Sequence, residues 1–180
     1  YQEQTYPDII KAIFDEAGFT DFDASGIRGE HPKHTYTVQY RESDFNFVSR
    51  LMEEEGIFYF FRHEAGKHTL VLADSKVAYE DSADKEVPFS GGTRTPRHIH
   101  RWEHRYEFVS GKFAHTDYNF ETPGTKLVGS ADTVLGLPNA TKYEVFDCPG
   151  GHLTKSDGNS KIRLRMEEEE LAFDMAEGES

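Results

Sequence analysis

YTVQYRESDFNFVSRLMEEEGIFYFFRHEAGKHTLVLAD, residues 36–74, is the stretch that decides the fold. Residues 35–40 are rich in β-branched and aromatic side chains, which predicts a strand. Ser43 follows where a helix N-cap is needed, because its hydroxyl can accept from the free amides of the first turn, and Asp44 favours the same helix end. Apolar residues at three- and four-residue spacing predict one buried helical face, formed by Phe45, Val48, Leu51 and Met52.

A β-hairpin is expected directly after this helix. Gly56 is well placed to end the helix in a left-handed conformation. Residues 57–61 are apolar and aromatic, residues 63–67 contain a Gly turn, and residues 68–73 bring Leu70 and Leu72 into alternation with polar or smaller side chains. This pattern predicts two antiparallel strands joined by a turn.

Three consecutive carboxylates, Glu53, Glu54 and Glu55, end the helix and suggest a metal site or an acid–base pair. Consecutive side chains on a helix point about 100° apart, so these carboxylates do not converge. We therefore interpret them as the solvated end of a scaffold helix.

The composition narrows the class of protein. With 180 residues the chain can form one sizeable domain or two small ones, and 14 Phe and 9 Tyr can supply a core. The formal net charge of −13 disfavours binding to nucleic acid or to an anionic membrane. Cys148 is the single cysteine, which excludes an internal disulfide. We see no signal peptide and no membrane-spanning segment, and we expect the chain to be a fragment of a longer protein.

The part of the chain before this stretch predicts a helix and then a loop. Thr5 or Tyr6 caps the helix and Gly18 ends it, with a buried face of Ile9, Ile10, Ile13, Phe14 and Ala17. Residues 20–33 are expected to be a loop, because Gly and Pro interrupt them. The polar, Gly- and Pro-containing residues 76–96 form the best internal boundary. We therefore expect two subdomains, residues 1–85 with two helices and a hairpin, and residues 86–180.

The second half predicts further strands and a late helix. Residues 98–110 alternate strongly and, with residues 112–119, suggest a long β-hairpin. Residues 121–141 are loop-like, and residues 142–147 predict a short strand. Residues 158–175 are mostly helix formers, but an alternating pattern leaves a strand open.

This late helix would begin at Ser156 or Asp157 and bury Ile162, Met166 and Phe173 on one face. Helices and strands do not follow βαβ order along the chain. The expected class is therefore α+β, mainly antiparallel β, with a few packed helices.

The strongest candidates for chemistry are His98, His100 and His104, which share one face of the expected strand at residues 98–110. Histidines two residues apart on a strand can bind zinc. The nearby sequence supplies no carboxylate or cysteine at a recognised ligand spacing, so a metal site is not the favoured interpretation. The same face carries Trp102, Tyr106 and Phe108, which we expect to pack inward.

The other titratable residues give weaker signals. His31 and His34, like His63 and His68, flank loops or turns, and we expect them to be exposed polar residues. Cys148 is expected to be a small buried thiol. The chain contains no G-x-S-x-G, phosphate-binding Gly loop or H-E-x-x-H motif.

Several blocks of the chain resemble the VgrG family, the spike proteins of the type VI secretion system. They are QYRESDFNFVSRLMEEEGIFYFF (residues 39–61), LAD (72–74), DYNFETP (117–123), and EVFDCPG (144–150) followed by RLRMEEEE (163–170). The blocks occur in the expected order across nearly the whole chain, which makes the match more specific than any single motif. Cys148 departs from the family, where this position is often aromatic.

The resemblance implies a fragment of a spike hub, built from barrel-like phage tail hub domains with associated helices. It implies a homotrimer in the full-length protein, with the Hcp tube, baseplate components and secreted effectors as partners. The spike would be assembled in the bacterial cytoplasm and secreted to the extracellular space or a target cell. It implies a structural protein without catalytic, metal-binding or cofactor-binding residues, and without a cofactor.

Two alternatives stay open from the sequence. A baseplate hub protein of a prophage contractile tail would have the same fold in a different machine. A metal-dependent hydrolase would use His98, His100 and His104 as ligands.

Overall fold

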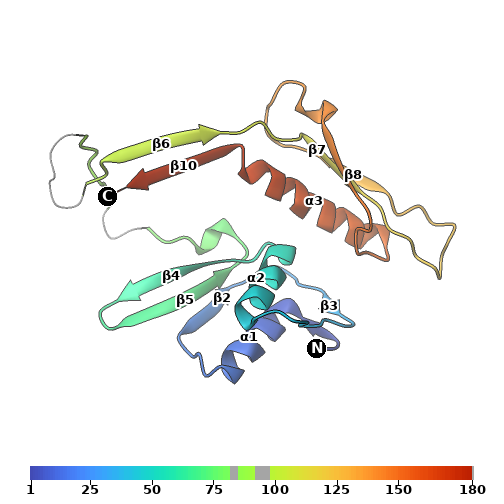
Figure 1. Ribbon diagram of the computed structural model, residues 1–180, viewed down its shortest axis with the longest axis horizontal. Helices are drawn as coiled ribbons and strands as arrows, with labels where there is room; N and C mark the ends of the chain where they lie inside the picture. Colours follow the sequence, from blue (N-terminus) through green and yellow to red (C-terminus); the bar gives the residue numbers. More distant parts are fainter. Residues whose placement is uncertain (82–84, 92–97, 180) are drawn as a thin grey trace. The chain divides into compact units, whose positions relative to one another are not determined.

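The computed structural model describes residues 1–81, 85–91 and 98–179. The chain divides into two compact units, Tyr1–Ala83 and Asp84–Ser180, which are described here separately. Helices are mixed with mostly antiparallel strand pairs, so the expected α+β class is confirmed. All sheets of the described residues are open, with free edges (Figure 1). No helix in the described part is long and apolar enough to cross a membrane.

Unit 1 packs two helices against a three-stranded sheet. The helices are α1 (Tyr6–Glu16) and α2 (Asp44–Glu55). The sheet has the order β2-β5-β4, with β2 (Phe22–Gly26) parallel to β5 (Lys67–Ala73) and β4 (Phe58–Glu64) antiparallel to it. The short strands β1 (Gln4–Thr5) and β3 (Lys33–His34) form a separate pair, and the 3-10 turn η1 (Lys76–Ala78) follows the sheet.

The α2 signals are confirmed at both ends. The Ser43 hydroxyl accepts from the Asn46 amide, and Gly56 adopts a left-handed φ of 68°. Thr5 caps α1 through the Asp8 amide. The core of the unit comprises Tyr6, Ile9, Ile10, Ile13, Phe47, Val48, Leu51, Met52, Ile57, Leu70 and Leu72.

Three local predictions in unit 1 are wrong. Residues 35–40 form no strand, and Thr37 instead exchanges main-chain hydrogen bonds with Tyr1 while the aromatic side chains of this segment stay exposed. Phe45 is exposed and Phe47 takes the buried position, because the helix turns the face of Val48, Leu51 and Met52 toward the sheet. The expected loop at residues 20–33 contains β2 and the first residue of β3. Both errors at strands arise because pairing partners lie far away in sequence.

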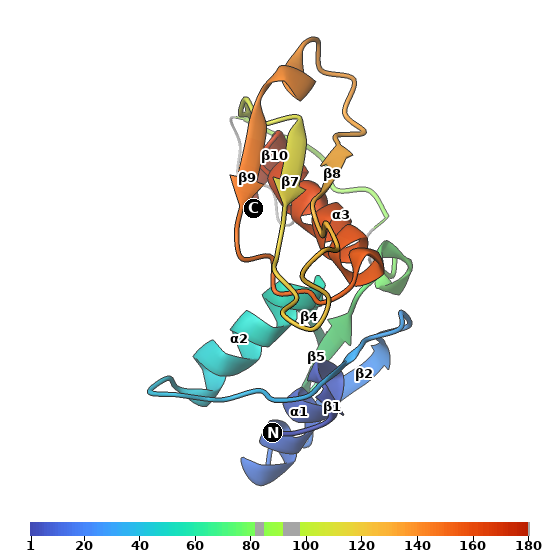
Figure 2. The same cartoon turned by 90° about the vertical axis from the view of Figure 1, so that its right-hand side faces the viewer.

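Unit 2 contains a second three-stranded sheet and a long helix. The order is β8-β7-β9, with β7 (Lys112–His115) antiparallel to β8 (Gly129–Asp132) and parallel to β9 (Glu144–Asp147). Helix α3 (Lys155–Leu171) packs on β7 and β8, as Figure 2 shows. Phe113, Ile162 and Met166 form the buried centre. The 3-10 turn η2 (Ala140–Lys142) precedes β9.

A two-stranded ribbon completes unit 2. Strand β6 (Arg101–Tyr106) pairs antiparallel with β10 (Asp174–Glu179). The hairpin expected between residues 98–110 and 112–119 is therefore wrong, because β6 finds its partner about seventy positions later in the chain. The loop expected at residues 121–141 contains β8.

The helix expected at residues 158–175 is confirmed as α3, but it begins and ends earlier than expected. Thr154 caps it through the Asp157 amide, rather than Ser156 or Asp157 acting as the cap. Ile162 and Met166 are buried as predicted, whereas Phe173 lies beyond the helix.

Candidate functional site

The three histidines singled out in the sequence do not come together as a ligand set. His98 is buried, whereas His100 and His104 each lie beside a carboxylate of β10. His100 Nε2 is 3.4 Å from Glu179, and His104 Nδ1 is 2.9 Å from Asp174. In the described part of the chain, no group of three or more His, Cys, Asp and Glu residues is arranged to hold a metal ion.

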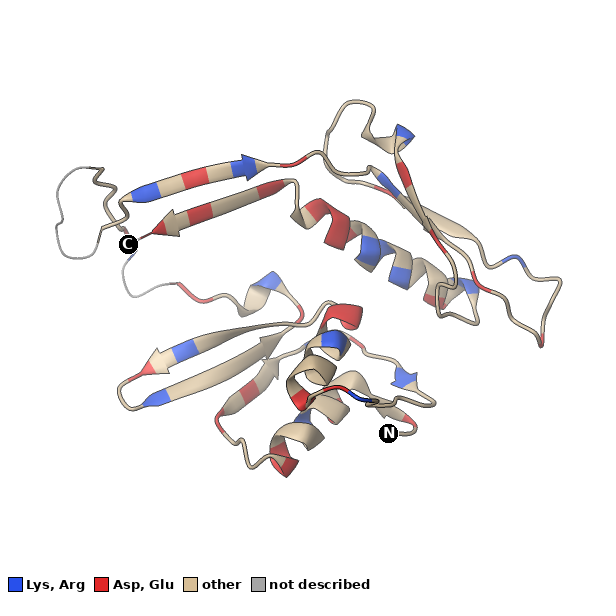
Figure 3. Ribbon diagram, viewed as in Figure 1, with Lys and Arg blue, Asp and Glu red and all other residues tan. Residues whose placement is uncertain are grey.

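The aromatic face of β6 does not pack inward, which corrects a prediction. Trp102, Tyr106 and Phe108 are all more than half exposed. Cross-strand neighbours of Trp102 and His104 are Gly178 and Ala176, which are too small to cover them. Figure 3 shows acidic and basic residues alternating along the same ribbon, where Arg101 pairs with Glu103 and Glu179.

A polar cluster that sequence reasoning missed lies in unit 1. Glu55, the last residue of α2, accepts from His31 Nδ1 at 2.5 Å and from His34 Nε2 at 2.7 Å. The other nitrogen of His31 lies 3.2 Å from Asp74, directly after β5. The side chains of Glu55, Asp74 and His31 are each at most 10% exposed. We call these four residues the His–carboxylate cluster.

Asp74 also holds the main chain of the neighbouring loop. Its carboxylate accepts from the amides of Arg28, at 3.0 Å, and Gly29, at 2.6 Å. Burial acts to raise the pKa of Asp74, but the amides of Gly29 and Arg28, together with His31, outweigh it and hold this pKa below its ordinary value. The cluster therefore fixes residues 28–34 against the ends of α2 and β5.

Tyr6 links the cluster to the core. Its ring stacks on His34 with centroids 3.8 Å apart, and its hydroxyl donates to Glu54 at 3.0 Å. Burial, reinforced by the charge of Glu54, raises the pKa of Tyr6 well above its ordinary value. The interpretation of Glu54 and Glu55 as a solvated helix end is therefore wrong, and only Glu53 is exposed.

The expectation for the histidines of unit 1 is half confirmed. His63 and His68 are exposed, with their Nδ1 atoms 2.7 Å apart, but His31 and His34 are largely buried. The sequence contains one signal for this pairing, which is its composition: histidines and a carboxylate-rich helix end can form hydrogen bonds once the chain folds. The carboxylates of Glu55 and Asp74 both accept hydrogen bonds from residues 28–34, so the cluster holds this loop in place.

Unit 2 buries a pair of stacked histidines. The rings of His115 and His152 are 4.5 Å apart between centroids. His115 Nε2 donates to the Gly158 carbonyl at 3.0 Å, and His152 Nε2 donates to the Leu127 carbonyl at 3.1 Å. Burial lowers the pKa of His115. Cys148, expected to be buried, is exposed.

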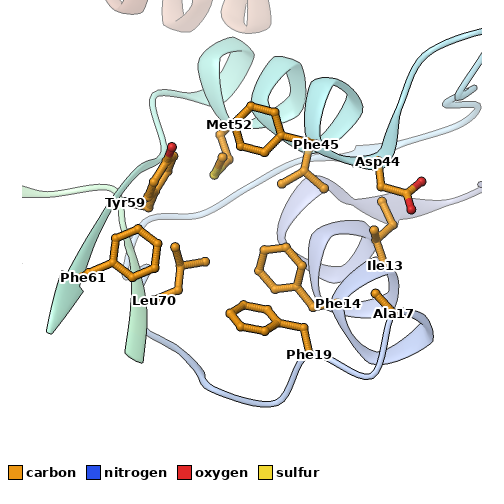
Figure 4. A pocket seen from close by; sticks show the side chains of 11 residues that line it. Ile13, Phe14, Ala17, Phe19, Asp44, Phe45, Met52, Tyr59, Phe61 and Leu70 are labelled. Carbon is orange, nitrogen blue, oxygen red and sulfur yellow. The ribbon is translucent and has the colours of Figure 1, made fainter. Parts of the chain in front are cut away.

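One concave surface of unit 1 is lined mainly by apolar side chains. Figure 4 shows this groove, of about 330 Å³, between α1, α2 and the sheet. We call it the aromatic groove; its lining residues are Ile13, Phe14, Ala17, Phe19, Asp44, Phe45, Val48, Met52, Tyr59, Phe61 and Leu70. Asp44 is the single charged residue of this lining, and the other lining side chains are aliphatic, aromatic or Met.

Comparison with known families identifies the chain. The sequence pattern of the phage tail baseplate hub (GPD) family matches residues 1–180. The chain belongs to this family. A solved tail protein of 43 kDa from prophage MuSo2 of Shewanella oneidensis is similar in fold, with a TM-score of 0.61 and 12% identity, over 99% of this chain and 50% of that one.

Type VI secretion spike proteins are also similar to this hub chain. VgrG1c of Pseudomonas aeruginosa is 40% identical over 176 residues, and VgrG1b of the same organism is 38% identical over 171 residues. Each alignment covers 93% of this chain but 23% of the relative, so the hub chain spans about a quarter of the length of these spike proteins. The resemblance to VgrG seen in the sequence is thereby confirmed.

Proposed function

We propose that the chain is part of the hub of a type VI secretion spike. The proposal is supported by the family match over residues 1–180, together with 38–40% identity to two spike proteins over 93% of the chain. In this proposal the full-length protein forms a homotrimer, docks on the Hcp tube and the baseplate, and helps to deliver secreted effectors. It is assembled in the bacterial cytoplasm and leaves through the secretion apparatus.

The described geometry supports a structural role for this segment. Its buried polar groups hold loops, and its aromatic groove is lined by apolar side chains with one carboxylate. Enzymes usually present convergent polar groups in such a pocket. The proposal therefore assigns no catalytic residue, metal or cofactor to this segment, and places any enzyme activity of the longer protein elsewhere.

Secretion of Hcp tests the proposed role. Removing residues 1–180 from the gene in its host should abolish release of Hcp into the medium, as fully as deletion of the gene does. The intact gene and a Val134→Ala variant should both restore release, because Val134 is 88% exposed. Continued release from the truncated gene would contradict the role in the spike.

The oligomeric state of the full-length protein gives a separate test. Light scattering or mass photometry should give the mass of a trimer. A stable monomer at micromolar concentration would contradict the trimeric base while leaving the family membership unaffected.

A baseplate hub of a prophage contractile tail is the second candidate. The fold likeness to the MuSo2 tail protein over 99% of this chain favours a shared architecture. Induction of prophages in the host separates the candidates, because a tail protein would co-purify with phage particles. A spike protein would instead require the secretion genes for its export.

A further inference from the structure

The turn end of the β4–β5 hairpin carries two histidines that contact each other. His63 on β4 and His68 on β5 are direct cross-strand partners, next to the closing pair of Glu64 and Lys67 (Figure 1). Direct partners have Cβ atoms about 4.5–5.5 Å apart, and their side chains leave the sheet on the same face. The Nδ1 atoms of the two rings are 2.7 Å apart. Both residues are exposed, so an ion from solvent can reach the pair.

The hairpin pair differs from other histidines of the described residues in what it contacts. Six of those histidines lie beside a carboxylate or a main-chain carbonyl: His31, His34, His100, His104, His115 and His152. In the hairpin, one Nδ1 donates to the other, so a single proton lies between two ring nitrogens. Imidazole binds metal ions through the same nitrogen lone pair that holds this proton. A metal ion can therefore take the place of the proton and use both rings as ligands.

The distance between the two nitrogens indicates which kind of ion fits. Imidazole nitrogen binds a divalent metal at about 2.0–2.1 Å, so two such bonds at a right angle need nitrogens about 2.9 Å apart. A tetrahedral angle between the same bonds needs about 3.3 Å. The observed 2.7 Å is nearer to the right angle, which the square-planar and tetragonal sites of Cu²⁺ and Ni²⁺ provide. Mg²⁺ and Ca²⁺ prefer oxygen ligands, so we expect neither to bind here.

The surroundings of the pair permit a bound cation. The Phe61 ring is stacked beside His63, with centroids 6.1 Å apart and planes 16° apart, which limits the freedom of this imidazole. The two cationic residues of the hairpin, Arg62 and Lys67, each lie within ion-pair distance of a carboxylate. The formal net charge of −13 also attracts cations to the chain.

We propose that His63 and His68 form a chelating site for a divalent transition-metal ion, Ni²⁺ or Cu²⁺, at the turn end of the hairpin. Each ring binds through Nδ1, the shared proton passes to water, and water molecules fill the other coordination positions. The ion joins β4 to β5 and stabilises folded unit 1, because the unfolded chain does not hold the two rings together. The proposed role in a secretion spike requires no metal and is independent of this site.

Calorimetric titration of the 180-residue chain with Ni²⁺ tests the site. We expect saturable binding, which His63→Gln and His68→Gln should each weaken at least about tenfold, because either substitution removes the chelate. The double variant should bind about as weakly as each single variant, and Mg²⁺ should not bind to the intact chain. Absence of saturable Ni²⁺ binding would overturn the proposal. Single substitutions that halve the number of bound ions without changing the affinity would also overturn it, because the rings would then act separately.

A matched control and a second measurement locate the ion. His104→Gln removes another exposed histidine, which lies beside Asp174, and should leave Ni²⁺ binding unchanged. In nuclear magnetic resonance, paramagnetic Ni²⁺ should broaden the ring signals of His63 and His68 at lower concentration than those of His104. Circular dichroism establishes that each variant is folded. An equal loss of binding in His104→Gln, or earlier broadening at other histidines, would indicate an adventitious ion only and would reject the hairpin site.

Discussion

Glu55 accepts hydrogen bonds from two imidazoles with its two carboxylate oxygens, at 2.5 and 2.7 Å. Its neighbours Glu53 and Glu54 have the same chemistry but point elsewhere, one to solvent and one to Tyr6. Helical geometry correctly excluded a site made of the three carboxylates. It could not reveal that residues 21 and 24 positions away would cover one of them.

We expect Glu55→Gln to destabilise unit 1 by about 2 kcal/mol, because a buried amide replaces a charged acceptor of two hydrogen bonds. The urea midpoint, followed by far-ultraviolet circular dichroism, measures this loss. Glu53→Gln on the same helix is the control and should change the free energy of unfolding by less than about 0.5 kcal/mol. Equal effects of both substitutions would show that the His–carboxylate cluster contributes no special stability.

Buried His115 predicts a loss of stability in unit 2 at acidic pH. Burial lowers its pKa below the ordinary value of 6.5, and this outweighs the bond to Gly158. Below about pH 6.5 the unfolded chain takes up a proton at His115, whereas the folded chain resists it. The stabilising contribution of neutral His115 to unit 2 is therefore fully present above this pH and is lost as the pH falls through the pKa of His115 in the folded state.

Nuclear magnetic resonance of the ring protons tests this expectation. The titration midpoint of His115 should lie below 6.5, and the urea midpoint of unit 2 should fall over the same pH range. A His104→Gln variant should retain this fall, because His104 lies on the exposed ribbon. A midpoint of His115 above 6.5 would reverse the sign and reject the argument.

At the scale of the element, residues at the two ends of α2 determine where this helix begins and ends. Ser43 accepts from the Asn46 amide, and Gly56 takes the left-handed conformation that ends the helix. Ser43→Ala should therefore cost about 1 kcal/mol, measured as a shift in the urea midpoint. Ser49→Ala, inside the same helix, should be neutral or slightly stabilising because alanine has the better helix propensity. An equal loss at both positions would rule out the cap as the cause.

Helix α3 depends on a close contact at its first turns. A Cβ added at Gly158 would lie 2.6 Å from the His152 ring, which itself packs on His115. Gly158→Ala should destabilise unit 2 by about 1–3 kcal/mol despite its better helix propensity, because the buried rings have to move. Gly136→Ala is the matched control, since nothing lies within 4 Å of its added Cβ. Thermal unfolding of the two variants provides the comparison, and a stabilised Gly158→Ala would disprove this contact.

At the scale of the whole molecule, the two units have separate buried clusters, one around Phe47 and Leu51 and one around Phe113 and Ile162. We expect each substitution to act on its own unit. Trp102 is the single tryptophan and lies in unit 2, so its fluorescence reports that unit alone. Glu55→Gln should shift the transition seen by circular dichroism and leave the Trp102 transition in place. A joint shift would show that the chain unfolds as one cooperative body.

The sequence by itself determined the features that depend on neighbouring residues: the caps of α2, the β4–β5 hairpin around Gly66, and the ordered blocks that resemble the spike proteins. Only the tertiary structure decided that β6 pairs with β10, that β2 joins β5 in parallel, and that His31 and His34 meet Glu55. The hydrogen bonds of caps and tight turns form between residues a few positions apart, so the local sequence predicts these features. Strand partners and buried His–carboxylate hydrogen bonds join residues from about twenty to seventy positions apart, and packing alone selects them among many chemically equivalent candidates.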